Sequence, residues 1–82
     1  MKYFAYVLKD SQGKFYKGFT SDLSRRLKEH RSGHTKTTRF MDNPSLVYSE
    51  EFDTLNEARK REVYLKTAAG RRFLKKVLNK GS

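Results

Sequence analysis

The sequence contains no cysteine, long apolar runs are absent, and acidic residues are few. Without cysteine there can be no disulfide framework, thiolate nucleophile or cysteine-based zinc site, so a metal ion would need oxygen or histidine ligands. No apolar run approaches the roughly 20 residues that cross a bilayer, and the apolar segment near the N-terminus is too short for a secretory signal. We therefore expect a cytoplasmic protein without a membrane partner.

Positive charge is what the sequence has in excess. Lys and Arg number 19 against 9 Asp and Glu, which gives a formal net charge of +10 over 82 residues. Solubility requires less charge than this, and a strongly basic surface favours polyanionic partners. We expect the partner to be a nucleic acid, bound by a single small domain over residues 1–82.

The pattern of apolar residues predicts an α+β fold. Residues 3–9 and 15–19 are rich in aromatic and β-branched residues and flank the turn-forming segment DSQGK, which predicts a β-hairpin. Residues 45–52 predict a third strand. Helices are expected at about 22–32, 54–68 and 70–80. The order β-β-α-β-α-α predicts a small three-stranded mixed or antiparallel sheet with three helices packed on it.

The polar, basic and aperiodic residues 33–44 predict a binding loop rather than a simple connection. After this loop and the third strand, Thr54 and Glu57 have the spacing of a capping box, which marks the start of the second helix.

An acidic residue interrupts the apolar stripe of the second helix. Leu55, Ala58, Leu65 and Ala69 form this stripe, and Glu62 lies on it. A carboxylate turned toward a core is costly unless it is paired or used. Two interpretations remain open at this point: an ion pair with a neighbouring Arg or Lys, or a functional site.

The first helix has the same irregularity. Arg26 and His30 lie on or beside the stripe formed by Leu23 and Leu27, and we expect them on the same side of the layer as Glu62. Taken singly, the arginine could extend past the core and the histidine could be a satisfied core residue. Their coincidence points to a site.

Two tyrosines are separated by the predicted hairpin. Tyr6 and Tyr16 can be strand neighbours that project from one face of the sheet, which would bring two phenols close together. Filling the core is the alternative role, because aromatic residues on small sheets are commonly core residues.

These residues together resemble the GIY-YIG endonuclease domain, in its small stand-alone bacterial form related to the N-terminal nuclease module of the excinuclease C subunit. FAY at residues 4–6 occupies the GIY position and YKG at residues 16–18 the YIG position. Arg26, His30 and Glu62 match the helix arginine, the His/Tyr position and the metal-binding glutamate. The likeness extends over most of the chain, and its order and spacing are more specific than either tripeptide.

The resemblance implies cleavage of a nucleic-acid phosphodiester with one divalent ion, Mg²⁺ or Mn²⁺. Glu62 would hold the metal, Tyr16 would help to deprotonate the attacking water and Tyr6 would position that water. An ordinary phenol, with a pKa of about 10, is a poor base at neutral pH, so this role requires nearby positive charge. Arg26 would stabilise the phosphate, and His30 would orient a tyrosine or assist proton transfer.

The chain departs from the family pattern at several positions. Phe4 and Ala5 replace the first two residues of GIY, Lys17 replaces the apolar residue of YIG, and Phe19 stands where some relatives carry a lysine. Gly18 is retained and would let the backbone approach the substrate. The residues expected to contact the nucleic acid are Lys17, Gly18, Arg25, Lys36, Arg39, Arg71 and Lys75.

Other functions are open on the sequence alone. A catalytically weak module that only binds nucleic acid would use the same basic residues, with Glu62 held by a Lys or Arg. A zinc site from His30 and His34 is disfavoured, because Gly33 is expected to end the helix between them and no third ligand is evident. Substrate specificity would come from a protein partner or a homodimer.

Overall fold

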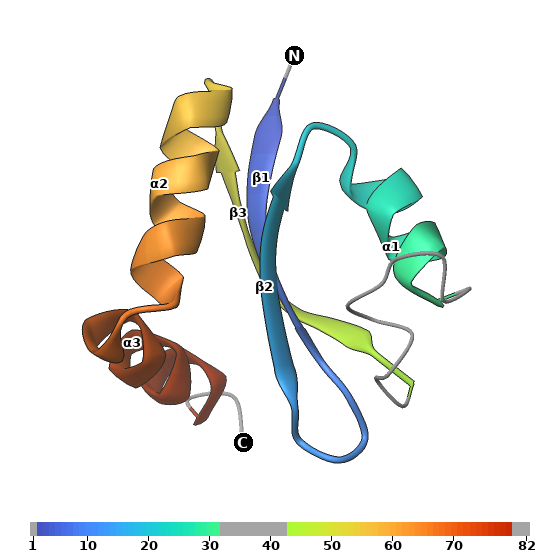
Figure 1. The fold of residues 1–82 in the computed structure, drawn as a ribbon, viewed down its shortest axis with the longest axis vertical. Coiled ribbons are helices and arrows are strands. Elements are labelled where there is room, and N and C mark those ends of the chain that lie inside the picture. The colour runs from blue at the N-terminus through green and yellow to red at the C-terminus, as the bar shows by residue number, and fades with distance from the viewer. Residues whose placement is uncertain (1, 32–42, 80–82) are drawn as a thin grey trace.

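The computed structural model describes residues 2–31 and 43–79, and within them it has the predicted α+β order of elements. The strands and helices are β1 (Tyr3–Lys9), β2 (Phe15–Thr20), α1 (Leu23–Arg31), β3 (Ser45–Phe52), α2 (Leu55–Leu65) and α3 (Ala68–Asn79). Figure 1 shows α2 and α3 on one side of the sheet and α1 on the other. The predicted loop at residues 33–44 lies almost wholly outside the described residues.

The sheet has the order β2-β1-β3, and both strand pairs are antiparallel. The β1–β2 turn forms because the Asp10 carboxylate accepts hydrogen bonds from the backbone N–H groups of Gln12 and Lys14, at 3.0 and 2.7 Å. Gly13 adopts a φ of 87°, which favours glycine. Because β1 is central, β2 is an edge strand, and one of its sides has no strand partner within residues 2–31 and 43–79.

Side chains of β1 are buried on both faces of the sheet. Val7 packs with Leu65 and Leu74 in the core beneath α2 and α3. Tyr6 and Leu8 alternate with it and are buried on the face that α1 covers. The α1 helix, which carries Arg26 and His30, covers one face of the sheet, and α2, which carries Glu62, covers the other. The expectation that these three residues lie on the same side of the sheet is therefore wrong.

The α2–α3 boundary differs from the prediction. The α2 helix ends at Leu65, and α3 begins at Ala68 because the Thr67 hydroxyl accepts a hydrogen bond from the Gly70 N–H at 3.1 Å and so caps the new helix. Two residues of the predicted apolar stripe are not buried: Leu55 is 47% exposed, and Ala69 is exposed on α3. The buried residues of α2 are Ala58, Glu62 and Leu65.

The start of α2 is as predicted. Thr54 is its N-cap, and its hydroxyl accepts a hydrogen bond from the Glu57 N–H at 3.2 Å.

No helix within residues 2–31 and 43–79 is long and apolar enough to cross a membrane.

Candidate active site

Tyr6 and Tyr16 lie side by side on the α1 face of the hairpin. The register pairs Tyr6 with Gly18 and Leu8 with Tyr16, so the two tyrosines are diagonal neighbours on adjacent strands. Their ring centroids are 6.2 Å apart and the ring planes meet at 45°. The predicted proximity of the two phenols is confirmed.

Gly18 leaves the space that the tyrosine rings fill. A Cβ atom at this position would lie 2.7 Å from the Tyr6 hydroxyl oxygen and 3.0 Å from Cε2 of Tyr16. Real Cβ atoms do not approach other atoms so closely, so any larger residue would displace a ring. The packing of the tyrosines therefore requires glycine here, independently of any approach by a substrate.

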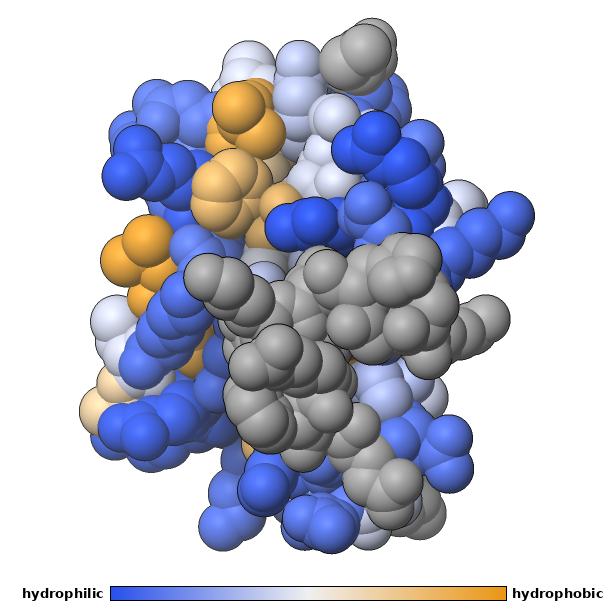
Figure 2. Space-filling view, turned by 45° about the vertical axis from the view of Figure 1, so that its right-hand side comes forward, coloured by the Kyte–Doolittle hydropathy of each residue, from blue (hydrophilic) through white to orange (hydrophobic). Residues whose placement is uncertain are grey.

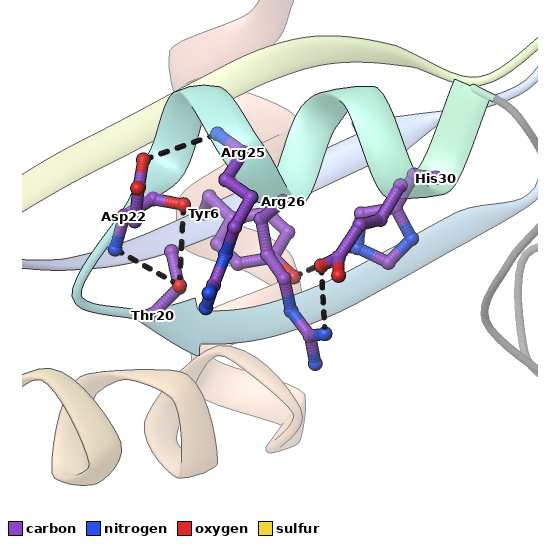
Figure 3. A network of polar contacts seen from close by, with 7 residues as sticks. Tyr6, Thr20, Asp22, Arg25, Arg26 and His30 are labelled. Atoms are coloured by element: carbon purple, nitrogen blue, oxygen red, sulfur yellow. Dashed lines mark hydrogen bonds and ion pairs between the residues drawn. The ribbon is translucent and has the colours of Figure 1, made fainter.

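His30 completes an aromatic cluster with the two tyrosines. It lies near the end of α1, is 2% exposed, and its ring centroid is 5.8 Å from Tyr6 and 5.1 Å from Tyr16. Its Nε2 shares a hydrogen bond of 2.9 Å with the Tyr6 hydroxyl (Figure 3). Burial lowers the pKa of His30 and raises that of Tyr6, so both groups are neutral near pH 7.

The α1 helix that carries His30 also brings Arg26 to the cluster. The Asp22 carboxylate caps the helix by accepting a hydrogen bond from the Arg25 N–H at 3.1 Å (Figure 3). The Arg26 side chain is about one-third exposed, and its Nη1 lies 3.3 Å from Oε1 of Glu29. The positive charge of Arg26 also lowers the pKa of His30 and favours ionisation of Tyr6.

A groove of about 700 Å³ follows the unpaired side of β2. We call it the edge groove; it is lined by residues 15–19 together with Arg26, Glu62 and Lys66. Arg26 reaches it from α1 and the other two from α2 and its C-terminal end, on opposite faces of the sheet. Arg26 and Glu62 therefore line the same groove although they come from opposite faces of the sheet.

Glu62 is a buried carboxylate at this groove. Its side chain is 8% exposed and forms an ion pair with Lys66, one turn further along the chain. The ion pair considered from the sequence is therefore present. Within the described residues, no group of three or more His, Cys, Asp or Glu is arranged to hold a metal ion. His34 lies outside the described residues.

A second groove continues from the first. This Phe15 groove, of about 390 Å³, shares Phe15 and Lys17 with the edge groove. It brings together three of the expected nucleic-acid contacts, Lys17, Arg71 and Lys75. Burial and the nearby charges of Arg71 and Lys66 lower the pKa of Lys17.

The other expected contacts are not brought into the two grooves. Arg25 is exposed on α1 and is not among the described residues that line either groove. Lys36 and Arg39 lie outside the described residues. Figure 2, which brings the α1 side of Figure 1 forward, shows mostly hydrophilic residues over the described part of that side, with smaller hydrophobic groups among them.

Several residues that line these grooves were not predicted from the sequence to belong to a site, among them Lys9, Phe15 and Lys66. The sequence could have indicated Lys66, because Lys66 follows Glu62 by four residues, which is the spacing of an ion pair on a helix. Phe15 is 45% exposed, and the ammonium groups of Lys9 and Lys17 lie 5.6 and 5.7 Å from its ring centroid. The apolar pattern of the strand gave no sign of this exposure.

Comparison with known proteins identifies the family. A family model described as the GIY-YIG catalytic domain matches residues 2–76. The chain belongs to the GIY-YIG family. The resemblance noted in its sequence is thereby confirmed, and with it membership of a nuclease family whose substrates are nucleic acids.

Similar GIY-YIG chains are of the same size. A UPF0213 protein of Staphylococcus saprophyticus is 36% identical over 77 residues, which cover 93% of this chain and 94% of the relative. A UPF0213 protein of Staphylococcus epidermidis is 35% identical over 77 residues with the same coverage. The solution NMR structure of a UPF0213 protein from Bacillus halodurans is 34% identical, has a TM-score of 0.59, and covers 100% of this chain and 88% of that one.

Proposed function

We propose that this protein is a metal-dependent endonuclease that hydrolyses a phosphodiester bond of a nucleic acid, with DNA favoured over RNA. The observation that carries the proposal is an edge groove lined by a tyrosine, an arginine and a buried glutamate, with a second tyrosine and a histidine packed against the first tyrosine. Family membership supports the same class of reaction.

The chemistry of the donor set fits a single hard cation. Glu62 offers one buried carboxylate at an open groove, where water and phosphate oxygens can supply the remaining ligands. Mg²⁺ and Mn²⁺ accept such oxygen sets, and Mg²⁺ commonly keeps several waters and uses one or two carboxylates. When bound, the ion would act as a Lewis acid toward the phosphate.

Tyr16 is the group that we assign to the attacking water. It lines the edge groove, whereas Tyr6 is fully buried behind it. With its own proton released to solvent, the Tyr16 phenolate oxygen accepts a proton from water as the water oxygen bonds to phosphorus. The phosphorus–oxygen bond to the leaving group then breaks, and the leaving oxygen takes a proton from solvent. The products are a phosphomonoester and a hydroxyl-terminated strand.

Tyr6 and His30 position the water through Tyr16. Their mutual hydrogen bond of 2.9 Å fixes two buried rings against the Tyr16 ring, so Tyr16 has a restricted orientation. Burial raises the pKa of Tyr6 and keeps its hydroxyl neutral, which suits a hydrogen-bonding role rather than that of a base.

Arg26 stabilises the negative charge that develops on the phosphate. Its planar guanidinium lines the groove and can form forked hydrogen bonds to two phosphate oxygens. The flanking phosphates lie along Lys17, Arg71 and Lys75 of the Phe15 groove, which adds salt-dependent affinity without sequence readout. Specificity would then come from a protein partner or a second copy of the chain.

A second candidate function is favoured by one specific observation. The Glu62 carboxylate forms an ion pair with Lys66, as expected for a module that binds nucleic acid through its basic grooves and has no use for a metal. Such a protein would bind DNA or RNA in a salt-sensitive manner and form no metal-dependent product.

A cleavage assay decides between the two functions. Labelled DNA and RNA of single-stranded, duplex, flap and junction structure are incubated with Mg²⁺ or Mn²⁺, and binding is measured in parallel. Glu62→Gln removes the charge of the carboxylate with little change of shape, and Glu51→Gln on β3 is the matched control. Metal-dependent cleavage that Glu62→Gln abolishes and Glu51→Gln retains is expected. Binding without cleavage by the wild type would establish the second function.

A further inference from the structure

The ion pair at Glu62 connects two components of the edge groove that the proposed reaction would use separately. Glu62 is almost wholly buried, whereas the Lys66 side chain is 58% exposed. A buried carboxylate needs a positively charged or hydrogen-bonding partner, and here the lysine provides it from the solvent side. Glu62 is held in place by α2, while Lys66 has a long flexible stem that can turn elsewhere.

We infer that Lys66 is a further phosphate-binding cation of the edge groove, which pairs with Glu62 until a divalent cation and a nucleic acid bind and then moves its ammonium group to a phosphate oxygen. This inference rests on the proposed function, because it assumes a metal ion at Glu62. It adds a residue and a coupling between metal and substrate that the proposed function does not contain.

The first argument is competition for one carboxylate. A divalent cation and an ammonium group attract the same Glu62 oxygens and repel each other, so Lys66 opposes metal binding to the free protein. The carboxylate is buried and its access is from the groove, where Lys66 lies. Metal binding must therefore displace Lys66 from Glu62.

The second argument is the charge that surrounds the displaced lysine. Lys66 shares the edge groove with Lys17, and Lys17 shares the Phe15 groove with Arg71. Burial, and then the charges of Arg71 and Lys66, lower the pKa of Lys17, so each of these two cations repels Lys17. When Lys66 leaves Glu62, its ammonium group therefore loses its anionic partner and remains in the groove with the cations Lys17 and Arg26. A phosphate in the edge groove relieves this repulsion, because Lys17, Arg26 and Lys66 all line it.

The consequence is a thermodynamic coupling between the metal and the nucleic acid. Each ligand favours the arrangement in which Lys66 has left Glu62, so each raises the affinity for the other. The free protein binds metal weakly, and the complex with nucleic acid binds it more tightly.

The test measures Mn²⁺ binding to the free protein by the electron paramagnetic resonance signal of unbound Mn²⁺. Lys66→Met removes the competing charge, and Lys60→Met is the matched control, because Lys60 is an exposed lysine of α2 that does not line the edge groove. Lys66→Met is expected to bind Mn²⁺ roughly fivefold more tightly than the wild type, and Lys60→Met about as tightly as the wild type. Equal or weaker binding by Lys66→Met would overturn the inference.

A second titration tests the transfer to phosphate. It uses the Tyr16→Phe background, in which the proposed base is absent, and a short labelled DNA as the nucleic acid. The DNA should raise Mn²⁺ affinity more in Tyr16→Phe than in the Tyr16→Phe, Lys66→Met double variant, by roughly fivefold. Equal increases in the two proteins would show that Lys66 does not contact the phosphate and would overturn the transfer.

Glu62→Gln separates failure of the inference from failure of the proposed function. If Glu62→Gln abolishes Mn²⁺ binding and Lys66→Met leaves it unchanged, the metal site stands and the role of Lys66 falls. If Glu62→Gln binds Mn²⁺ as the wild type does, or if neither the wild type nor Lys66→Met binds any, the proposed function and the inference fall together. Circular dichroism of each variant confirms that its fold is retained.

Discussion

Gly18 lies directly opposite Tyr6 in the β1–β2 ladder, and a methyl group at Gly18 would come within 2.7 Å of the Tyr6 hydroxyl oxygen. This relationship makes the aromatic cluster dependent on a residue that has no side chain. The glycine gives the Tyr6 ring room to lie across β2, where its hydroxyl reaches His30.

Gly18→Ala is therefore expected to disturb the cluster. The added methyl group must displace the Tyr6 or Tyr16 ring, at a cost of about 1–3 kcal/mol in the free energy of unfolding. Urea unfolding measures the loss, and near-ultraviolet circular dichroism reports the tyrosine environment. Gly13→Ala is the contrast: it has open space but a φ of 87°, so it should destabilise the turn without altering the tyrosine signal. Unchanged stability in Gly18→Ala would contradict the close packing of Tyr6 over Gly18.

Tyr6→Phe isolates the hydrogen bond to His30. The ring stays, but the buried Nε2 of His30 loses its 2.9 Å partner, which should lower the free energy of unfolding by about 1–2 kcal/mol. If Tyr6 positions Tyr16, kcat should fall while KM changes little. Tyr3→Phe on the same strand serves as the control for loss of a hydroxyl. A reduced stability with an unaltered kcat would leave Tyr6 a structural role only.

His30 should make the stability depend on pH in the weakly acidic range. Burial and the charge of Arg26 lower the pKa of His30 in the native state, although Glu29 acts in the opposite direction. The unfolded chain, with a histidine pKa of about 6.5, then binds more protons than the native state. Stability is accordingly expected to fall as the pH drops below about 6.5.

His30→Gln should remove this pH dependence, and His34→Gln should not. Thermal unfolding measured between about pH 5 and 8, in steps across the value near 6.5, supplies the comparison. An equal slope in wild type and His30→Gln would show that the buried histidine does not cause it.

Arg26→Lys is expected to slow cleavage although the charge is conserved. The forked guanidinium can contact two phosphate oxygens, whereas an ammonium group is a single point of charge, so the rate should fall roughly tenfold or more. Single-turnover kinetics measures the step, and Arg59→Lys is the control, because Arg59 is an exposed arginine of α2 that lines neither groove. A rate equal to that of the wild type would remove Arg26 from the proposed chemistry.

Lys17, Arg71 and Lys75 are expected to bind phosphates rather than bases. Replacing each by Gln should weaken binding about equally for different sequences and reduce the salt slope by about one for each phosphate that is no longer neutralised. Lys60→Gln should leave that slope unchanged, since Lys60 is not among the residues that line the Phe15 groove. Fluorescence anisotropy over a range of salt concentrations gives the slopes.

Local features of the fold could be predicted because neighbouring residues cause them. The turn chemistry of Asp10 and Gly13 closes the hairpin, and that closure brings Tyr6 and Tyr16 onto one face. Thr54 caps α2 as its spacing with Glu57 indicated. The second helix was predicted to continue to about residue 68, whereas α2 ends at Leu65. The sequence alone did not show that Thr67 would cap a new helix rather than lie inside the second one.

The sequence by itself determined the elements, their order, the family and the set of residues with unusual polar positions. Only the tertiary structure decided how those residues meet. Because β1 is buried on both faces, its pattern cannot tell which helix covers which face. Arg26 and Glu62 accordingly approach from opposite faces and meet at the unpaired edge of β2, where Lys66 neutralises the carboxylate. Which side chains line the same groove depends on how segments that are distant in the sequence pack together. The hydrophobic periodicity of one segment does not encode that packing.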